Sequence, residues 1–108
     1  MKTLLLAAAV ALGISSTAGA APRLAQAPEL HRADRLQPYV LDQIGTIAKV
    51  DLRVCVAADG HVKSVNLLHG TKLPQFDRAV MTDVTDWRYT ADAIPRCLIE
   101  KVEYHATR

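Results

Sequence analysis

The stretch that decides the fold is the run Val50-Asp51-Leu52-Arg53-Val54-Cys55-Val56 with the Asp59-Gly60 pair that follows it. Apolar and polar residues alternate in this run, and a period of two residues is typical of a β-strand with one buried face. An Asp-Gly pair between two such runs favours a tight hairpin turn. We therefore predict a return strand over residues 62–68. A two-residue turn would place Val54 opposite Val65 and Leu52 opposite Leu67, so that the apolar faces match.

A third strand, predicted over residues 97–104, can be aligned with the first through its cysteine and its charges. An antiparallel register that places Cys97 opposite Cys55 also creates opposite-charge pairs on the same face. These pairs are Asp51 with Lys101 and Lys49 with Glu103. The first strand is then central, and the strands lie in the order 2-1-3. The same register puts Glu100 opposite Leu52 on the apolar face, which the alternation does not explain.

Cys55 and Cys97 are the only two cysteines of the chain. In an oxidising compartment such a pair forms a disulfide, and we expect a structural one here. A zinc site with His61 and His69 would need a compact ligand spacing that the chain does not have. A redox-active pair would have the Cys-x-x-Cys spacing, which is also absent.

Two helices are predicted from apolar residues at helical spacing. The main helix runs from Pro74 to about residue 86, and its apolar stripe comprises Phe76, Ala79, Val80, Val84 and Trp87. The remaining positions, including Asp83 and Asp86, are interpreted as a solvated polar face rather than as a catalytic carboxylate pair. A shorter helix is predicted over residues 34–47, from the spacing of Leu36, Val40, Ile44 and Ile47, with Pro38 in its first turn and Gly45 near its end. The predicted fold class is α+β, a three-stranded antiparallel sheet with one main helix on one face and a short N-terminal helix.

The N-terminus has the pattern of an export signal. Lys2 precedes an apolar run over residues 4–14, and Ala18-Gly19-Ala20 fits a small-residue cleavage site. A run of about 11 apolar residues is short for a membrane span, which needs roughly 20. We predict a signal peptide over residues 1–20, a flexible lead-in over 21–33 and a domain over 34–108, with no membrane span after cleavage. An uncleaved anchor over residues 3–21 is the alternative. The predicted location is the periplasm, with secretion as the alternative.

Length and composition exclude several classes of protein. A chain of 108 residues with 22% charged residues is typical of one folded domain. A net charge of +2 is too small for a protein that binds nucleic acid by neutralising phosphates. Ser64 has no evident catalytic partners, and Trp87 and Tyr89 are assigned to the core. Four scattered histidines are assigned to the surface, namely His31, His61, His69 and His105. We predict no enzyme activity, cofactor or metal, with a small enzyme as the remote alternative.

Several features of residues 50–104 resemble the C-terminal domain of TonB-type energy transducers. These are the first strand, Asp59-Gly60-His61-Val62, Phe76-Asp77-Arg78-Ala79-Val80, Trp87-Arg88-Tyr89 and Pro95 before the last strand. The resemblance implies a small periplasmic α+β domain that couples inner-membrane energy to outer-membrane receptors. It also implies that the last strand region recruits an extended receptor segment by strand addition. The corresponding residues here are Val102, Glu103, Tyr104 and His105.

The chain departs from the pattern of a full transducer before the domain. Only Pro22, Pro28 and Pro38 precede residue 50, where the resemblance begins, and Pro38-Tyr39 reverses the usual Tyr-Pro entry. With its N-terminus cleaved, the chain would have neither the anchor nor the long spacer that transmits force. Our first hypothesis is therefore a non-enzymatic periplasmic binding module, engaging a protein partner such as an outer-membrane receptor segment in TonB-dependent transport. The second is a secreted, disulfide-stabilised structural or stress-related domain that shares the fold without energy transduction and forms a homodimer through the same edge.

Overall fold

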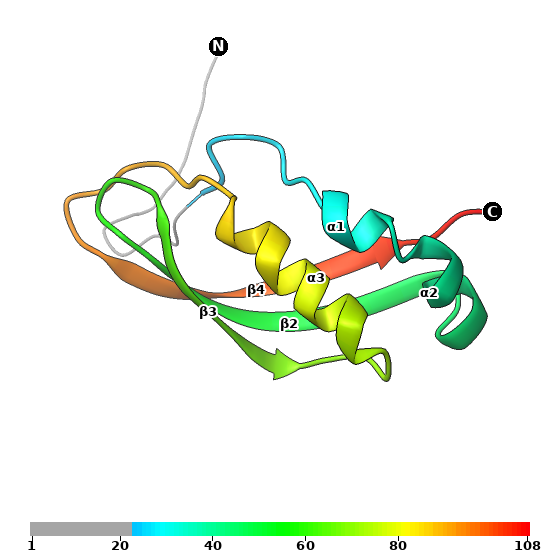
Figure 1. Ribbon diagram of the computed structural model, residues 1–108. Coiled ribbons are helices and arrows are strands. Elements are labelled where there is room, and N and C mark those ends of the chain that lie inside the picture. Colours follow the sequence, from blue (N-terminus) through cyan, green and yellow to red (C-terminus); the bar gives the residue numbers. More distant parts are fainter. Residues whose placement is uncertain (1–22) are drawn as a thin grey trace, which may run out of the picture.

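The computed structural model describes residues 23–108, so the predicted signal peptide and its cleavage site lie outside the described residues. Along the chain, two short helices come first, and two strands, one longer helix and a third strand follow (Figure 1). The elements are α1 (His31–Asp34), α2 (Gln37–Gln43), β2 (Ile47–Val56), β3 (Val62–His69), α3 (Pro74–Thr85) and β4 (Arg96–His105). No helix within residues 23–108 combines the length and apolar character needed to cross a membrane.

The sheet is antiparallel with the strand order β3-β2-β4, which confirms the predicted order 2-1-3. β2 is the central strand, and Val54 pairs with Val65 as the alternation predicted. Cys55 pairs with Cys97, and this register continues without a shift from Ile47 opposite His105 to Val56 opposite Arg96. The predicted register of β2 with β4 is therefore correct throughout, and that of β2 with β3 is correct from Leu52 to Cys55.

The hairpin between β2 and β3 is one residue longer than predicted. The Gly60 amide donates to the Ala57 carbonyl at 2.9 Å, and the Ala57 amide donates to the His61 carbonyl at 2.8 Å. Residues 58–60 thus form a three-residue loop, and Gly60 adopts a φ of +95° at its end. This geometry is a turn followed by a β-bulge, which is the next most common hairpin after the two-residue turn. The bulge restores the predicted pairing further along the strands.

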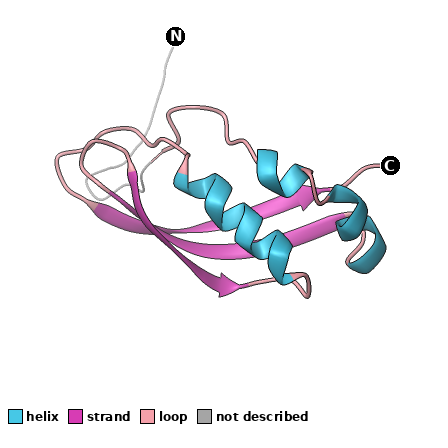
Figure 2. Ribbon diagram, viewed as in Figure 1, coloured by secondary structure: helices cyan, strands magenta, loops and turns pink. Residues whose placement is uncertain are grey.

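The core lies between α3 and one face of the sheet. No helix of the described residues covers the other face, which we call the uncovered face (Figure 2). Phe76, Val80 and Val84 of α3 are fully buried, as their helical spacing predicted. They meet the inward-facing residues of β2, which are Ala48, Val50, Leu52, Val54 and Val56. Trp87 and Tyr89, which follow α3, are also buried, so their assignment to the core is confirmed.

The predicted helix over residues 34–47 is shorter in the structure. α2 covers only Gln37–Gln43, with Pro38 in its first turn, and Asp34 belongs to the separate helix α1. Gly45 has a φ of +132°, a left-handed backbone conformation that ends a helix, and the chain then enters β2 at Ile47. Ile47 therefore lies on the exposed face of the sheet rather than on a helix.

The segment before α1 packs against the chain that follows α3. The Ala25 amide donates to the Arg88 carbonyl at 2.8 Å, and Leu24 forms an isolated β-bridge with Tyr89. The Trp87 indole Nε1 donates to the Glu29 carbonyl at 2.9 Å. The packed unit therefore includes residues on the N-terminal side of the domain boundary predicted at residue 34.

Glu100, which the sequence left unexplained, has a partner on the apolar side of the sheet. The Tyr89 hydroxyl donates to Glu100 Oε2 at 2.6 Å. Burial of the phenol, together with this hydrogen bond, raises the pKa of Tyr89 well above its ordinary value. A carboxylate can therefore lie opposite Leu52 because a buried hydroxyl satisfies it.

Candidate functional site

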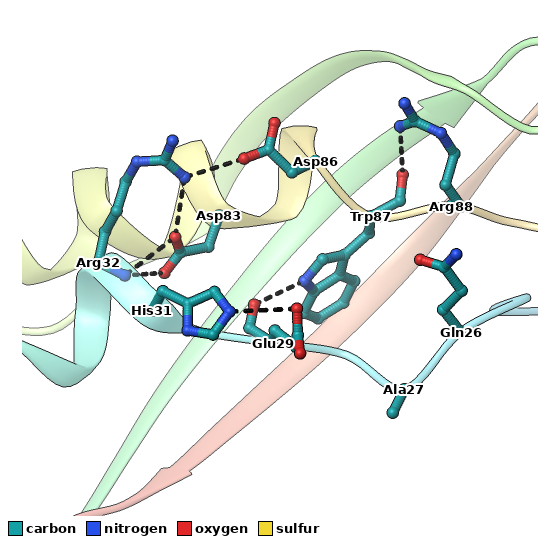
Figure 3. Close-up of a pocket in the computed structure, with 9 residues that line it drawn as sticks. All are labelled: Gln26, Ala27, Glu29, His31, Arg32, Asp83, Asp86, Trp87 and Arg88. Atoms are coloured by element: carbon teal, nitrogen blue, oxygen red, sulfur yellow. Dashed lines mark hydrogen bonds and ion pairs between the residues drawn. The ribbon is translucent and has the colours of Figure 1, made fainter.

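A small cavity lies where the segment before α1 meets the end of α3 (Figure 3). Its volume of about 60 Å³ leaves space for only a few water molecules. It is lined by Gln26, Ala27, Glu29, His31, Arg32, Asp83, Asp86, Trp87 and Arg88. Several of these residues are bonded to one another, and the bonds of Asp83 and Arg32 show that they form a structural junction.

Asp83 is the central residue of this junction, and its predicted place on a solvated face is wrong. It is 3% exposed and accepts hydrogen bonds from the backbone amides of Arg32, at 3.1 Å, and Ala33, at 3.0 Å. The first amides of a helix have no partner within it, and a buried carboxylate satisfies those of α1. Asp86 is exposed, as predicted.

The Arg32 guanidinium joins the two carboxylates from the solvent side. Its Nη1 donates to Asp86 Oδ2 at 3.0 Å and to Asp83 Oδ1 at 3.1 Å, and these bonds raise the pKa of Arg32. Both carboxylate oxygens of Asp83 therefore accept hydrogen bonds. The cluster holds α1 against α3, and its geometry provides no activated nucleophile.

Asp77 is a second buried carboxylate on α3, and its predicted place on the solvated polar face, outside the apolar stripe, is also wrong. It accepts from the Thr71 amide at 2.9 Å and from the Thr71 hydroxyl at 2.8 Å. These bonds fix the loop between β3 and α3. Both buried aspartates thus join backbone outside α3 to this helix, Asp77 the loop just before it and Asp83 the segment about fifty residues earlier, which is a structural role.

The outer edge of β4 carries the unused hydrogen-bonding groups of the sheet. The Ala106 amide donates to the Thr46 carbonyl at 2.9 Å, in the same register as β4 with β2. Hydrogen-bonded pairs alternate along an antiparallel ladder, so even-numbered β4 residues bond to β2. The odd-numbered residues therefore direct their N–H and C=O groups outward, and they are Cys97, Ile99, Lys101, Glu103 and His105. Within residues 23–108, no other strand pairs with this edge.

The opposite edge of the sheet is less regular. The pairing of β3 with β2 shifts register near both of its ends, next to Asp51 and next to Val56. Such bulges twist an edge strand and hinder the addition of another strand. β4 pairs over ten residues with no shift, so it offers the straighter template.

The uncovered face beside the β4 edge carries alternating charges. Lys101 Nζ lies 3.8 Å from Asp51 Oδ2, and Lys49 Nζ lies 3.9 Å from Glu103 Oε2, which are the two pairs that the sequence predicted. Exposed pairs of this kind add little to stability. They do fix the order of charges that a neighbouring strand would meet.

The four residues predicted to bind a partner lie on β4 but face opposite sides of the sheet. Glu103 and His105 are exposed, whereas Val102 and Tyr104 are buried. The Tyr104 ring lies 5.3 Å from that of Phe76, and its hydroxyl donates to Asp34 Oδ1 at 2.6 Å. Val102 and Tyr104 therefore support the edge from beneath.

Ile99 and Lys101 complete the outward-facing row, although neither was among the predicted partner-binding residues. Ile99 is 53% exposed and so places an apolar side chain in this row. The alternation that assigned Cys97 to the exposed face could have identified both residues, since they follow it at intervals of two.

Cys55 and Cys97 form the predicted disulfide on the same uncovered face, with an S–S distance of 2.07 Å. It joins the central strand to β4 near the start of the free edge. All four histidines are exposed, as predicted. Within the described part of the chain, no three His, Cys, Asp or Glu side chains gather where they could hold a metal ion.

Comparisons with protein-family models, curated proteins and solved structures found no match for this chain. The features that bear on function are therefore the geometry of the β4 edge and the chemistry of the residues along it.

Proposed function

We propose that the protein is a non-enzymatic binding module that captures an extended segment of a partner protein by strand addition along β4. The observation that carries this proposal is the regular free edge of β4, with outward main-chain groups at five alternate residues. In strand addition, main-chain hydrogen bonds supply affinity and the side chains beside them supply specificity. The ten-residue ladder to β2, the disulfide and the contact of Tyr104 with Phe76 of α3 hold β4 in place for this task.

We further propose that the module works in the periplasm, on a segment of an outer-membrane receptor. The disulfide favours an oxidising compartment, because such bonds rarely persist in the cytosol. The export-signal pattern of residues 1–20 and the resemblance to the C-terminal domain of TonB-type transducers support the same location and partner class.

The row of exposed side chains on β4 defines the chemistry of the partner segment. In an antiparallel arrangement, the partner would place an acidic residue opposite Lys101 and a basic residue opposite Glu103. An apolar residue would fall opposite Ile99. The best segment would therefore read Lys-x-Glu-x-Val in its own direction, with alternate side chains on the exposed face.

The proposal can be tested by titrating the full chain with a synthetic peptide that contains this pattern and measuring the dissociation constant. Replacing Lys101 with proline removes one outward N–H and leaves the ladder to β2 intact, which an edge position tolerates. We expect Lys101→Pro to weaken peptide binding at least about tenfold, from the lost hydrogen bond and its neighbours. Lys101→Ala keeps the N–H and serves as the matched control, with a smaller loss of affinity.

Amide hydrogen exchange gives a second readout. Peptide binding should slow the exchange of the amides of Ile99, Lys101, Glu103 and His105, while the even-numbered amides, already bonded to β2, change little. Uniform slowing along β4, or binding that Lys101→Pro leaves unaffected, would show that the peptide binds elsewhere and would refute strand addition at this edge. Peptides from the periplasm-facing segments of the host's outer-membrane receptors then test the partner class.

A further inference from the structure

We infer that the free edge of β4 also pairs with β4 of a second copy of this chain, antiparallel and about a twofold axis at Val102. In that arrangement Lys101 of each copy faces Glu103 of the other. The inference rests on the charge order and hydrogen-bond pattern of β4, and it requires no receptor segment. A twofold contact of this kind is isologous, the commonest form of protein dimer.

The hydrogen-bond pattern limits the registers that two β4 edges can adopt. The outward groups belong to odd-numbered residues, so odd must face odd across the new ladder. A twofold axis at Lys101 or at Glu103 would oppose that residue to its own copy, and directly opposed like charges are destabilising. An axis at Glu100 would place Lys101 opposite Ile99, with no charge pair. Only the axis at Val102 converts both charges into attractive pairs.

This register also extends the charge pairs already present within one chain. Lys49 lies 3.9 Å from Glu103, and Glu103 would face the partner's Lys101, which in turn lies beside the partner's Asp51. The row across the joined sheets would read positive, negative, positive, negative, and the twofold axis generates a second such row. The two inner charges of each row, those of Glu103 and Lys101, would have a neighbour of the opposite sign on both sides.

The new contact joins the two sheets into one without a break. Residues 99–105 of the two strands would exchange about eight main-chain hydrogen bonds, two for each hydrogen-bonded pair. Val102 meets its own copy on the side of the sheet that faces α3. The dimer covers the same outward groups that would bind a partner segment, so the two binding events exclude each other.

Two single substitutions of opposite sign test the register directly. In a Lys101→Glu dimer, the new carboxylate of each copy would face the Glu103 carboxylate of the other copy. In a Glu103→Lys dimer, the new ammonium group of each copy would face the Lys101 ammonium group of the other. Both variants therefore turn two attractive pairs into two repulsive ones, and we expect the dissociation constant of the dimer to rise at least about tenfold. An equimolar mixture restores both attractive pairs, because one copy then carries two acidic residues and the other two basic ones. The mixture should form a heterodimer as readily as the wild type forms a homodimer.

The measurement is sedimentation equilibrium of the full chain with its disulfide formed, up to about 1 mM, followed by native mass spectrometry of the mixture. Recovery of the heterodimer also shows that both variants are folded. The matched control uses Lys63→Glu on β3 and Glu29→Lys before α1, which make the same charge changes at exposed positions away from β4. Each control variant should dimerise alone as the wild type does.

A wild-type chain that stays monomeric at about 1 mM would overturn the inference. So would a dimer that neither single variant weakens, or a mixture that associates no more tightly than its components. These outcomes are separate from those of the peptide titration. A monomer can still bind the peptide, and a dimer in the expected register can form when no peptide binds.

Discussion

Removing the carboxylate of Asp83 should strongly destabilise the protein, although this residue lies on α3 and not on the β4 edge. Asp83→Ala takes away the acceptor of two backbone amides, those of Arg32 and Ala33, and of the Arg32 guanidinium. Ala33 is fully buried, so water reaches its amide poorly once the carboxylate is gone. An orphaned buried donor costs about 1–3 kcal/mol, and the partly exposed Arg32 adds less. We expect a total loss of about 3 kcal/mol in the free energy of unfolding.

The assay is urea denaturation followed by the fluorescence of Trp87, the only tryptophan of the chain. Its indole donates to the Glu29 carbonyl in the segment that Asp83 helps to hold, so the signal reports on this junction as well as on global unfolding. For a domain of this size, a loss of about 3 kcal/mol corresponds to a fall in Tm of roughly 12–24 °C.

Two variants separate the buried carboxylate from surface charge. Asp86→Ala removes an acceptor whose side chain is 67% exposed and which meets Arg32 in solvent, and it should cost no more than about 0.5 kcal/mol. Asp83→Asn keeps one oxygen as an acceptor and should fall between the two alanine variants. If Asp83→Ala lies within about 0.5 kcal/mol of the wild type, or if Asp86→Ala costs as much, the reasoning from buried amides is wrong.

Three further predictions concern stability. Replacing Cys55 and Cys97 together with serine should cost about 4 kcal/mol in urea denaturation, because the bond closes a loop with a separation of 42 residues, and a loss below about 1 kcal/mol would contradict this. Burial and a hydrogen bond to Asp34 raise the pKa of Tyr104, so its contribution to stability is complete below pH ~10 and is lost as the pH rises further. Tyr104→Phe should therefore reduce the fall in the free energy of unfolding at alkaline pH. An unchanged slope of this free energy against pH would contradict the prediction. Gly60→Ala would force a methyl group against the Tyr89 carbonyl at a residue with positive φ. Its loss in the free energy of unfolding should be well over the ~1 kcal/mol expected for Gly45→Ala, where φ is also positive but the space is open. Equal melting temperatures of the two variants would contradict this difference.

The registers of the sheet were predictable because each depends on a pattern within short stretches of sequence. The alternation around Val54 fixed which residues face the core, and a slip of one residue would have exposed all of them. The third strand required one further constraint, and the pairing of Cys55 with Cys97 supplied it. The turn length was predicted wrongly because a bulge can restore a register after a longer loop.

The two buried aspartates were missed for a different reason. Helical periodicity sorts residues by hydrophobicity, and it assigns Asp77 and Asp83 to solvent because an unpaired buried charge is costly. Whether a carboxylate finds donors depends on segments elsewhere in the chain. The amides that satisfy Asp83 belong to residues about fifty positions away, in a helix of four residues that the sequence did not predict.

The free edge of β4 combines both kinds of information. The sequence by itself determined the strand, its register, its disulfide and the order of Lys101 and Glu103, because period-two burial and opposite charges act between directly opposed residues. Only the tertiary structure decided which main-chain groups of β4 point outward and which strand edge is regular. Those properties follow from the phase of the hydrogen-bond ladder and from the position of the bulges, which no side-chain pattern within a single strand specifies.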